Sequence, residues 1–246
     1  EGLRRVIGLD YTGHVALVTG GTAGTGRGIA ERFLQAGAAV VVCGRKVPES
    51  LPSADGRTAT FVACDVRDAE SVDKLVAEVL AQHGRLDVLV NNAGGAPFTD
   101  AATASPRFSE KIIALNLTSA LHCSVAANRV MQKQDGGGSI VNIASVSGAR
   151  PSPGTAAYGA AKAGLLNLTR SLAVEWAPRV RVNAITAGMI RTEQAHLHYG
   201  DEAGIARVSA TVPLQRLALP EDIANACLFL ASPLASYVSG ADLLIH

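Results

Sequence analysis

The sequence predicts an α/β fold in which helices flank a doubly wound parallel sheet. Two observations lead to this prediction. Short apolar runs rich in β-branched residues alternate with longer segments whose apolar residues recur at helical spacing, and this alternation continues to residue 245. No linker-like shift in composition interrupts it, so we expect residues 1–246 to form a single domain.

Four apolar runs in the first half of the chain have the length and composition of buried parallel strands. Helical patterns precede the second run and the fourth, and Gly37 ends the first of these helices. The expected strands are 15–18, 40–42, 60–62 and 86–90, and the expected helices are 27–36 and 71–82.

The same alternation continues in the second half. The expected helices are 110–134, 156–176 and 221–230, and the expected strands are 139–143, 181–185 and 242–245. Residues 189–212 break the rhythm, because they lack an apolar period and contain His196, His198 and Tyr199. We expect this segment to be a mobile loop with a short helix that acts as a lid over the substrate.

Composition and charge exclude several classes of protein. Hydrophobic residues make up 48% of the chain and charged residues 17%, which argues against disorder. The formal net charge is +1 and no long basic run occurs, so we expect no binding to nucleic acid or to a membrane surface. Because no apolar stretch reaches 18 residues and no signal-peptide pattern is present, we expect a cytoplasmic protein.

The cysteines and histidines form no metal-binding or redox pattern. The four cysteines are Cys43, Cys64, Cys123 and Cys227. They are widely spaced without a C-x-x-C pair, so we expect reduced, buried thiols. His196 and His198 are two residues apart, which is a poor spacing for a shared metal on a helix, and we expect no metal site.

A glycine-rich segment follows the first expected strand and leads directly into a helix. Its sequence is Thr19-Gly-Gly-Thr-Ala-Gly-Thr-Gly26, with the spacing T-G-x-x-x-G-x-G. Glycines let a backbone turn tightly and approach a pyrophosphate, and the free N–H groups at a helix N-terminus attract anionic oxygens. The position of the motif favours a bound dinucleotide, although glycines after a strand can also serve a turn alone.

Further motifs occur in a fixed order along the chain. They are Asn91-Asn-Ala-Gly94, Asn116, Ser145, and Tyr158 with Lys162 in a Y-x-x-x-K spacing. Together with the glycine segment they resemble the short-chain dehydrogenase/reductase family, in particular its single-domain members similar to 3-oxoacyl-thioester reductases. The resemblance spans nearly the whole chain and implies a Rossmann fold that binds a nicotinamide dinucleotide.

Tyr158 and Lys162 are one helical turn apart on the same face of the expected helix. At about 4 Å and an effective dielectric constant near 20, an ammonium favours a phenolate by about 4 kcal/mol, or roughly three pKa units. We therefore expect the pKa of Tyr158 to be lowered toward neutral, so that the phenol acts as general acid or base. For this spacing taken alone, the alternative is a helix-surface pair without function.

The family resemblance implies a role for each of four catalytic candidates. Tyr158 would exchange the proton, and Ser145 would hydrogen-bond the substrate oxygen. Lys162 would also hold the nicotinamide ribose, and Asn116 would help to hold a water that connects the lysine to solvent.

The type of cofactor depends on the residues after the second expected strand, where an acidic side chain would bind the adenosine ribose of NAD. Here the chain reads Cys43-Gly-Arg-Lys46, without a carboxylate, and Arg45 could meet a 2′-phosphate. We therefore expect NADP(H) rather than NAD(H), with solvated loop charges as the alternative for Arg45 and Lys46. Ala23 counts against this, because many NADP-using relatives carry a basic residue there.

The residues expected to contact the cofactor come from the glycine segment, the strand ends and the segment after Ala187. They are Gly20, Thr22, Gly24, Thr25, Gly26, Arg45, Asp65, Val66, Asn92, Ala93, Gly94, Tyr158, Lys162, Gly188, Ile190 and Thr192. The resemblance assigns the adenine to Asp65 and Val66, although Asp65 could instead cap a turn. Ala187 replaces a proline that is usual in the family, which removes a restraint on φ before Gly188.

These motifs predict an NAD(P)(H)-dependent oxidoreductase that interconverts a ketone and a secondary alcohol. A 3-oxoacyl thioester or another small carbonyl compound is the expected substrate. One alternative is a catalytically idle scaffold or sensor that binds a nicotinamide nucleotide on the same fold. Another is an enoyl reductase or epimerase relative, although enoyl reductases of this fold usually have a wider tyrosine-to-lysine spacing.

Substrate selection is expected from Val146, Ser147 and Arg150 together with the lid at 189–212. Arg150 or Arg191 could meet an anionic substrate, although each could also be a solvated charge. The Ala-rich helices over 110–134 and 156–177 look like those that pair between subunits in the family, so we expect a homotetramer or a homodimer.

Overall fold

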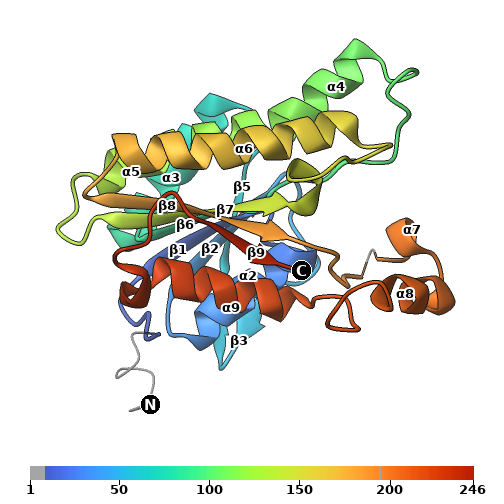
Figure 1. The fold of residues 1–246 in the computed structure, drawn as a ribbon. Coiled ribbons are helices and arrows are strands. Elements are labelled where there is room, and N and C mark those ends of the chain that lie inside the picture. The colour runs from blue at the N-terminus through green and yellow to red at the C-terminus, as the bar shows by residue number, and fades with distance from the viewer. Residues whose placement is uncertain (1–8, 194) are drawn as a thin grey trace.

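The computed structural model describes residues 9–193 and 195–246, and in this part of the chain seven strands form one parallel sheet (Figure 1). The strand order is β5-β2-β1-β6-β7-β8-β9. The strands are β1 (Val15–Thr19), β2 (Ala39–Gly44), β5 (Thr60–Ala63), β6 (Val88–Asn91), β7 (Gly138–Ser145), β8 (Val180–Ala187) and β9 (Asp242–Ile245). The predicted α/β parallel fold is confirmed.

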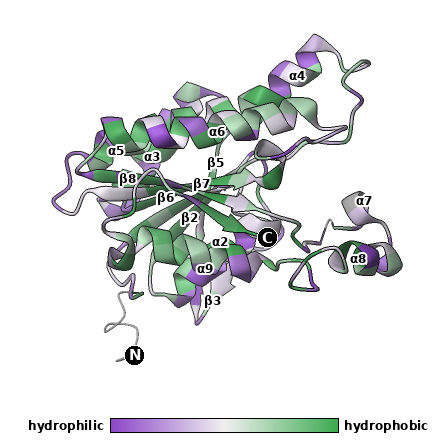
Figure 2. Cartoon of the chain, in the orientation of Figure 1, coloured by the Kyte–Doolittle hydropathy of each residue, from purple (hydrophilic) through white to green (hydrophobic). Residues whose placement is uncertain are grey.

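Helices cover both faces of the sheet (Figure 1). One face carries α2 (Gly24–Gln35) and α9 (Pro220–Ala231), and the other carries α3 (Ala69–His83), α4 (Pro106–Ile113), α5 (Ser119–Met131) and α6 (Ala156–Glu175). Alternate residues of a strand enter the two cores: Val18 packs on the side of α2, and Leu17 on the side of α3. Since both faces are covered, the strands are almost continuously hydrophobic (Figure 2).

The chain reverses its direction of progress across the sheet between β1 and β6. Strands earlier in the chain extend from β1 to β5, and later ones extend from β6 to β9. In open α/β sheets, ligands bind in the crevice at the carboxyl ends of the strands beside such a reversal. The topology therefore locates a candidate site at the ends of β1 and β6.

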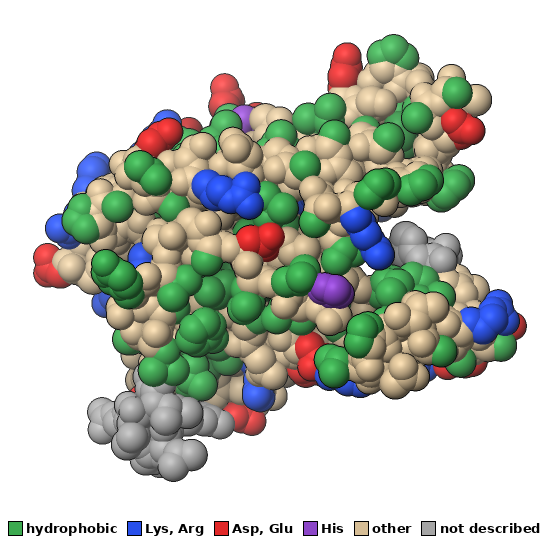
Figure 3. Space-filling model, in the orientation of Figure 1, with side chains coloured by type: hydrophobic (Ala, Val, Ile, Leu, Met, Phe, Trp, Pro, Cys, Tyr) green, Lys and Arg blue, Asp and Glu red, His purple; other side chains and the backbone are tan. Residues whose placement is uncertain are grey.

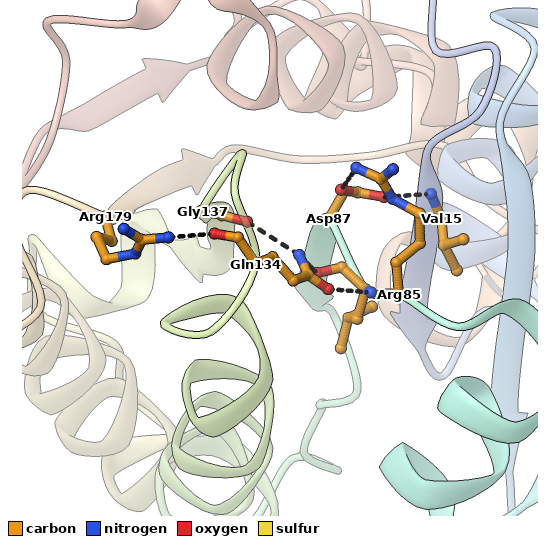
Figure 4. Close-up of polar contacts among 7 residues, drawn as sticks. Val15, Arg85, Asp87, Gln134, Gly137 and Arg179 are labelled. Atoms are coloured by element: carbon orange, nitrogen blue, oxygen red, sulfur yellow. Dashed lines mark hydrogen bonds and ion pairs between the residues drawn. The ribbon is translucent and has the colours of Figure 1, made fainter.

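The opposite, amino end of the sheet is closed by polar contacts (Figure 4). Asp87 accepts hydrogen bonds from the Val15 backbone at 2.8 Å and from the Arg85 guanidinium at 2.7 and 2.8 Å. The Gln134 side chain accepts from the Leu86 N–H and donates to the Leu86 and Gly137 carbonyls. These contacts join the start of β1 to the connections that precede β6 and β7, so this end of the sheet has a structural role.

The helix expected over 110–134 is interrupted. Residues Ala114–Thr118 form a π-helical turn between α4 and α5. At its centre the Asn116 side chain donates to the Ile112 carbonyl at 2.9 Å, which competes with the helical backbone ladder. Short π-helical turns occur frequently at functional sites, and sequence periodicity does not reveal them.

The segment over 189–212 contains two helices where we expected one. They are α7 (His196–Tyr199) and α8 (Glu202–Ser209), which stand beside the sheet rather than on either face (Figure 1). Asp201 caps the N-terminus of α8, where its side chain accepts a hydrogen bond from the Gly204 backbone at 2.9 Å. The expected lid includes Gln194 and the His198 side chain, which lie outside the described residues.

A short hairpin, β3 (Ser53–Ala54) and β4 (Arg57–Thr58), was not predicted. Its turn is Asp55-Gly56, with φ of 50° and 73°, a dipeptide that favours tight hairpin turns. In the described chain, no helix combines the length and the hydropathy required to span a bilayer.

Candidate functional site

The ends of β1, β6, β7 and β8 surround a cavity of about 300 Å³. The predicted residues that line it are Gly20, Thr25, Gly26, Asn92, Ala93, Gly94, Ser145, Tyr158, Lys162, Gly188 and Ile190. Five residues that the sequence reasoning missed also line it: Ala23, Gly95, Ile143, Ala144 and Ala187. Motifs far apart in the sequence thus meet at one place.

The glycine segment forms the turn from β1 into α2. Gly20 has a φ of 62°, in the left-handed region that favours glycine. A Cβ on Gly26 would lie 2.4 Å from the Gly20 carbonyl oxygen, so only glycine allows this close packing of the helix on the turn. Ala23 precedes α2 without a side-chain cap, and the first amides of the helix therefore border the cavity.

Thr19 and Asn92 fasten this turn to β6. The Thr19 hydroxyl accepts hydrogen bonds from the Asn92 and Ala93 backbones at 3.0 Å each. The Asn92 side chain donates to the Thr19 carbonyl at 2.9 Å and to the Gly20 carbonyl at 3.3 Å. These bonds hold the two strand ends beside the reversal in a fixed relation.

Ser145 and Tyr158 bring two hydroxyl groups together. Ser145 is the last residue of β7, and Tyr158 lies in the first turn of α6. Burial raises the pKa of Tyr158, and a hydrogen bond with the Ser145 side chain opposes this increase. The expectation that Lys162 lowers the pKa of Tyr158 below its ordinary value is wrong for this structure, because burial dominates.

The Lys162 ammonium lies over the face of the Tyr158 ring. Its Nζ is 5.6 Å from the Tyr158 ring centroid and donates a hydrogen bond to the Ile143 carbonyl at 2.7 Å. The side chain is 4% exposed, and burial lowers its pKa to about 8. Burial is therefore the largest influence on the pKa of both side chains.

Asn116 connects the π-helical turn with the loop after β6. Its Oδ1 accepts from the Gly95 backbone at 2.8 Å, and its Nδ2 donates to the Gly95 carbonyl at 2.9 Å. A Cβ on Gly94 would lie 2.7 Å from this Oδ1 and 3.2 Å from the Lys162 Nζ, so the three residues pack closely. Asn116 therefore fixes the backbone that borders the lysine.

The end of β2 carries the residues expected to select the cofactor. Arg45 is exposed, and the Thr22 hydroxyl lies 3.8 Å from the position of a Cβ on Gly44. Asp65 is bound by the Arg67 guanidinium, which holds the pKa of this carboxyl at about 2. Val66 is 7% exposed within the hydrophobic core. Asp65 and Val66 do not line the 300 Å³ cavity.

The segment after β8 closes the cavity from the other side. The Gly188 N–H donates to the Ile245 carbonyl at 2.8 Å, and Ile190 forms a β-bridge with Ala218. The Thr192 side chain lies 3.6 Å from the position of a Cβ on Gly24, against the glycine segment. Backbone contacts with Ile245 and Ala218 therefore hold this segment although Ala187 replaces the usual proline.

A second cavity of about 930 Å³ adjoins the first and shares Gly188 with it. Its walls come from the turn after β7, from α8 and the residues that follow it, and from the end of β9. In Figure 3 the molecule is hollowed between the α7–α8 lobe and the main body. Of the predicted selectivity residues, Val146 and Arg150 line this cavity, whereas Ser147 does not.

Tyr199 lines the larger cavity, and the sequence reasoning placed it in the expected lid without naming it as a site residue. Its pKa is raised by burial and by the charge of the nearby Tyr158. It lies in the segment without an apolar period, so no pattern in the sequence identified it. Within the described residues, no three His, Cys, Asp or Glu side chains are grouped so that they could hold a metal ion.

Comparison with known proteins agrees with this geometry. A protein family described as enoyl-(acyl carrier protein) reductase matches residues 20–246. The human dehydrogenase/reductase SDR family member 4 is 36% identical over 94% of this chain and 85% of its own length. The chain belongs to the short-chain dehydrogenase/reductase family. The 3α-hydroxysteroid dehydrogenase of Mediterraneibacter gnavus is 38% identical over 94% of each chain.

A solved structure of this family has the same fold. Aldohexose dehydrogenase of Thermoplasma acidophilum, in ligand-free form, superposes with a TM-score of 0.87 at 31% identity, covering 96% of this chain and 93% of that chain. As a short-chain dehydrogenase/reductase, the protein is an oxidoreductase that uses NAD(P) to interconvert carbonyl compounds and alcohols.

The residues present fit the dinucleotide that this family uses. The uncapped N-terminus of α2 suits a pyrophosphate, because its amides and helix dipole attract anionic oxygens. Gly20 and Gly26 border the cavity, and because neither has a Cβ the turn can pack closely against Asn92 and Ala93. At the other end of the cavity, Lys162 and the Ser145–Tyr158 pair provide donors for a ribose and for a reacting oxygen.

Proposed function

We propose that this short-chain dehydrogenase/reductase catalyses the NADP(H)-dependent interconversion of a ketone and a secondary alcohol, with Tyr158 as the general acid and base. The observation that carries this proposal is the proximity of the Ser145 and Tyr158 side chains next to a buried Lys162. The pair lines the 300 Å³ cavity, and Val146, the residue after Ser145, lines the 930 Å³ cavity, so a substrate in the larger cavity would lie next to a dinucleotide in the smaller one.

In this proposal the two hydroxyl groups hold the substrate oxygen. Ser145 donates a hydrogen bond to the carbonyl oxygen, and Tyr158 transfers its proton to that oxygen as the alcohol forms. The raised pKa keeps the phenol protonated at neutral pH, which suits carbonyl reduction. The nicotinamide, when bound, supplies the hydride to the carbonyl carbon or accepts it from the alcohol.

Lys162 and Asn116 assist this reaction through charge and positioning. The cationic Nζ of Lys162, fixed by the Ile143 carbonyl, favours negative charge on the phenol oxygen during proton transfer and holds the ribose. Asn116 positions the Gly94–Gly95 backbone against the lysine. The water relay that the family resemblance implies for Asn116 is part of the same proposal.

The test of this function uses Tyr158→Phe, which keeps the ring and deletes the proton donor. We expect kcat for ketone reduction to fall at least about 1,000-fold while dinucleotide binding stays within about twofold. Tyr237→Phe, at a fully exposed tyrosine, is the matched control. Substrates are ketones, enoyl thioesters, polyols and sugars, followed at the nicotinamide absorbance. Near-normal turnover by Tyr158→Phe, or turnover of enoyl thioesters alone, contradicts the proposal.

The preference for NADP(H) is supported by the end of β2. Arg45 is exposed there, and the small Gly44 and the Thr22 hydroxyl leave room for a phosphate. The nearest carboxylate expected to bind cofactor, that of Asp65, is already bound by Arg67. A 2′-phosphate would gain a bidentate guanidinium partner without meeting an unpaired carboxylate.

We expect kcat/KM to be at least about tenfold higher with NADPH than with NADH, since charge-assisted hydrogen bonds contribute about 1.5–3 kcal/mol. Arg45→Ala should remove most of this preference by weakening NADPH alone. Arg107→Ala removes the same charge from an exposed position on α4 and should leave the ratio unchanged. A wild-type preference for NADH contradicts the role of Arg45.

We also propose, from the sequence arguments, that residues 1–246 act as a single domain with a lid at 189–212, in the cytoplasm, as a homotetramer or homodimer. Several large apolar side chains support assembly: Val174 is 81% exposed on α6, and Leu234 is 54% exposed after α9. Exposed apolar side chains of this kind mark association surfaces. Light scattering after size-exclusion chromatography tests the state of assembly.

A further inference from the structure

The 930 Å³ cavity beside the Ser145–Tyr158 pair has walls of two chemical kinds. Apolar side chains form most of its lining, including Val146, Val208 and Leu214. Leu214 is 69% exposed although it borders the cavity, so apolar surface remains to be covered there. In the space-filling view, hydrophobic side chains gather on both sides of the hollow between the lobe and the main body (Figure 3).

The arginines in and near the cavity divide into two that are paired with carboxylates and two that are not. Arg191 donates to both carboxylate oxygens of Glu202 at 3.0 Å, and Arg216 donates to both oxygens of Asp222. Arg150 and Arg207 are exposed and line the cavity from opposite walls, one after β7 and the other on α8. Neither forms an ion pair with another described residue.

The balance of charge among the side chains that line the cavity is therefore positive. Asp222 is the one Asp or Glu side chain among the described lining residues, and Arg216 neutralises it. Arginine recognises carboxylate, sulfonate and phosphate groups through two parallel N–H donors. Two arginines without acidic partners at the walls of an apolar cavity match a ligand that has an apolar body and an anionic end.

We infer that the substrate is a bulky apolar ketone or secondary alcohol that carries an anionic group remote from the reacting carbon, bound by Arg150 and Arg207. This inference rests on the proposed function, since the Ser145–Tyr158 pair fixes the reacting oxygen. The cavity volume lies within the 300–1,000 Å³ that small-molecule sites usually occupy. A polyol fits less well, because apolar walls leave its remaining hydroxyl groups without hydrogen-bond partners.

The test uses ketones that differ only in the remote charge. Three oxo acids of increasing size, 4-oxopentanoate, 7-oxooctanoate and 3-oxo-5β-cholan-24-oate, are each compared with the corresponding methyl ester, and D-threitol and D-glucose are assayed in the oxidative direction. For each pair kcat/KM is measured in the wild type and in Arg150→Gln, Arg207→Gln and Arg191→Gln. The last variant removes the same charge from the lobe at a residue that is already paired.

We expect the largest oxo acid to be reduced with a kcat/KM about tenfold above that of its ester at low ionic strength. Arg150→Gln or Arg207→Gln should lower this acid-to-ester ratio at least about threefold, mainly through KM, and Arg191→Gln should not change it. Added salt should reduce the ratio in the wild type.

Equal rates for acids and esters, a preference for the polyols, or an equal loss of the ratio in Arg191→Gln would overturn the inference while leaving the proposed function in place. A wild-type protein that reduces neither acids nor esters with NADPH or NADH, and oxidises neither polyol, contradicts the proposed function itself.

Discussion

The carboxyl end of the sheet, where Ser145 lies next to Tyr158 of α6, and the lobe formed by α7 and α8 border neighbouring cavities, but they are packed very differently. The sheet end is supported by two large cores in which side chains such as Leu17 and Leu89 are at most 1% exposed. The lobe has a small separate cluster of four buried residues: Ala195, Ile205, Val212 and Leu217.

Their polar contacts differ in the same way. Buried or half-buried hydrogen bonds from Thr19, Asn92 and Asn116 hold the strand ends. In the lobe, Arg191 and Glu202 form an ion pair whose side chains are 51% and 77% exposed. Proton transfer requires fixed distances, whereas substrate selection tolerates variation, so the difference in packing separates the part that reacts from the part that selects.

The pH dependence of the reaction tests the end of the sheet that holds Ser145 next to Tyr158, and it has the largest expected effect. Because burial raises the pKa of Tyr158, the phenolate needed for alcohol oxidation is scarce at neutral pH. We expect kcat for oxidation to rise about tenfold per pH unit between pH 6 and 8, while reduction varies less than about threefold. Lys162, whose pKa is about 8, stays mainly protonated over most of this range.

Steady-state rates in both directions at constant ionic strength check this expectation. Tyr199→Phe serves as the control, since Tyr199 is the other titratable phenol near Tyr158, and its profile should keep the same slope. An oxidation rate that does not change over this range would mean that burial does not control the ionisation of Tyr158.

Two truncations compare the cores directly. Leu89→Ala creates a cavity beside the fully buried strand β6, and we expect it to lower the free energy of unfolding by about 2–5 kcal/mol. Ile205→Ala removes apolar contact in the small cluster of the lobe, where Ile205 is 7% exposed. It should raise the substrate KM severalfold and lower global stability by less than Leu89→Ala.

Chemical denaturation and steady-state kinetics on both variants distinguish these results. The lobe is expected to open locally at lower cost than the body, so the loss in Ile205→Ala appears first in substrate binding. If both truncations lower global stability equally, the lobe belongs to the same cooperative unit as the sheet, and the comparison fails.

Local spacing in the sequence was sufficient to predict the parallel sheet, the glycine turn and the proximity of Tyr158 to Lys162, whereas the joint role of Ser145 and Tyr158 came from the family resemblance. Each depends on one strand end or one helical turn, and parallel strands bring their carboxyl ends to one edge. Ile143 and Ala144 were missed because a small or apolar residue near the end of a strand has no sequence signal that separates a cavity wall from the core. Ala187 was noted as a replacement for proline, but not as a residue of the cavity wall.

Tertiary burial determined the features that could not be predicted. The sequence indicates that Tyr158 and Lys162 are near each other, but not that the ammonium lies over the face of the ring and bonds to Ile143. The direction of the Tyr158 pKa shift follows from that burial. The π-helical turn depends on a contact between Asn116 and Gly95, 21 residues apart, and the position of Tyr199 depends on packing of the lobe.

The buried charge of Lys162 makes the free energy of unfolding of the protein depend on pH. The folded pKa is about 8, below the ordinary value of 10.5, so the unfolded chain binds more protons between these values and stability from this group rises with pH. The full difference corresponds to about 3 kcal/mol. Below pH 8 the charged lysine destabilises the fold by this amount.

Lys162→Met keeps a long side chain and removes the charge. We expect its stability relative to the wild type to fall by up to about 3 kcal/mol as pH rises from 7 to 10.5. Comparing the two proteins by urea denaturation at each pH cancels the other groups that titrate there, such as Tyr11 and Cys227. A difference that does not change with pH would mean that burial does not lower the pKa of Lys162 in the folded protein.

The smallest expected effect comes from the ion pair that holds the lobe. Glu202→Gln removes the partner of Arg191, and because both side chains are more than half exposed, we expect a loss of less than about 1 kcal/mol that disappears at high salt. The matched change in the body is Asp87→Asn, which affects a carboxylate 9% exposed that also accepts from the Val15 backbone (Figure 4). It should cost about 1–3 kcal/mol with little salt dependence, because a buried charged hydrogen-bond network loses its acceptor. Equal and equally salt-sensitive losses, measured by thermal unfolding at two ionic strengths, would show that the lobe is held as firmly as the base of the sheet.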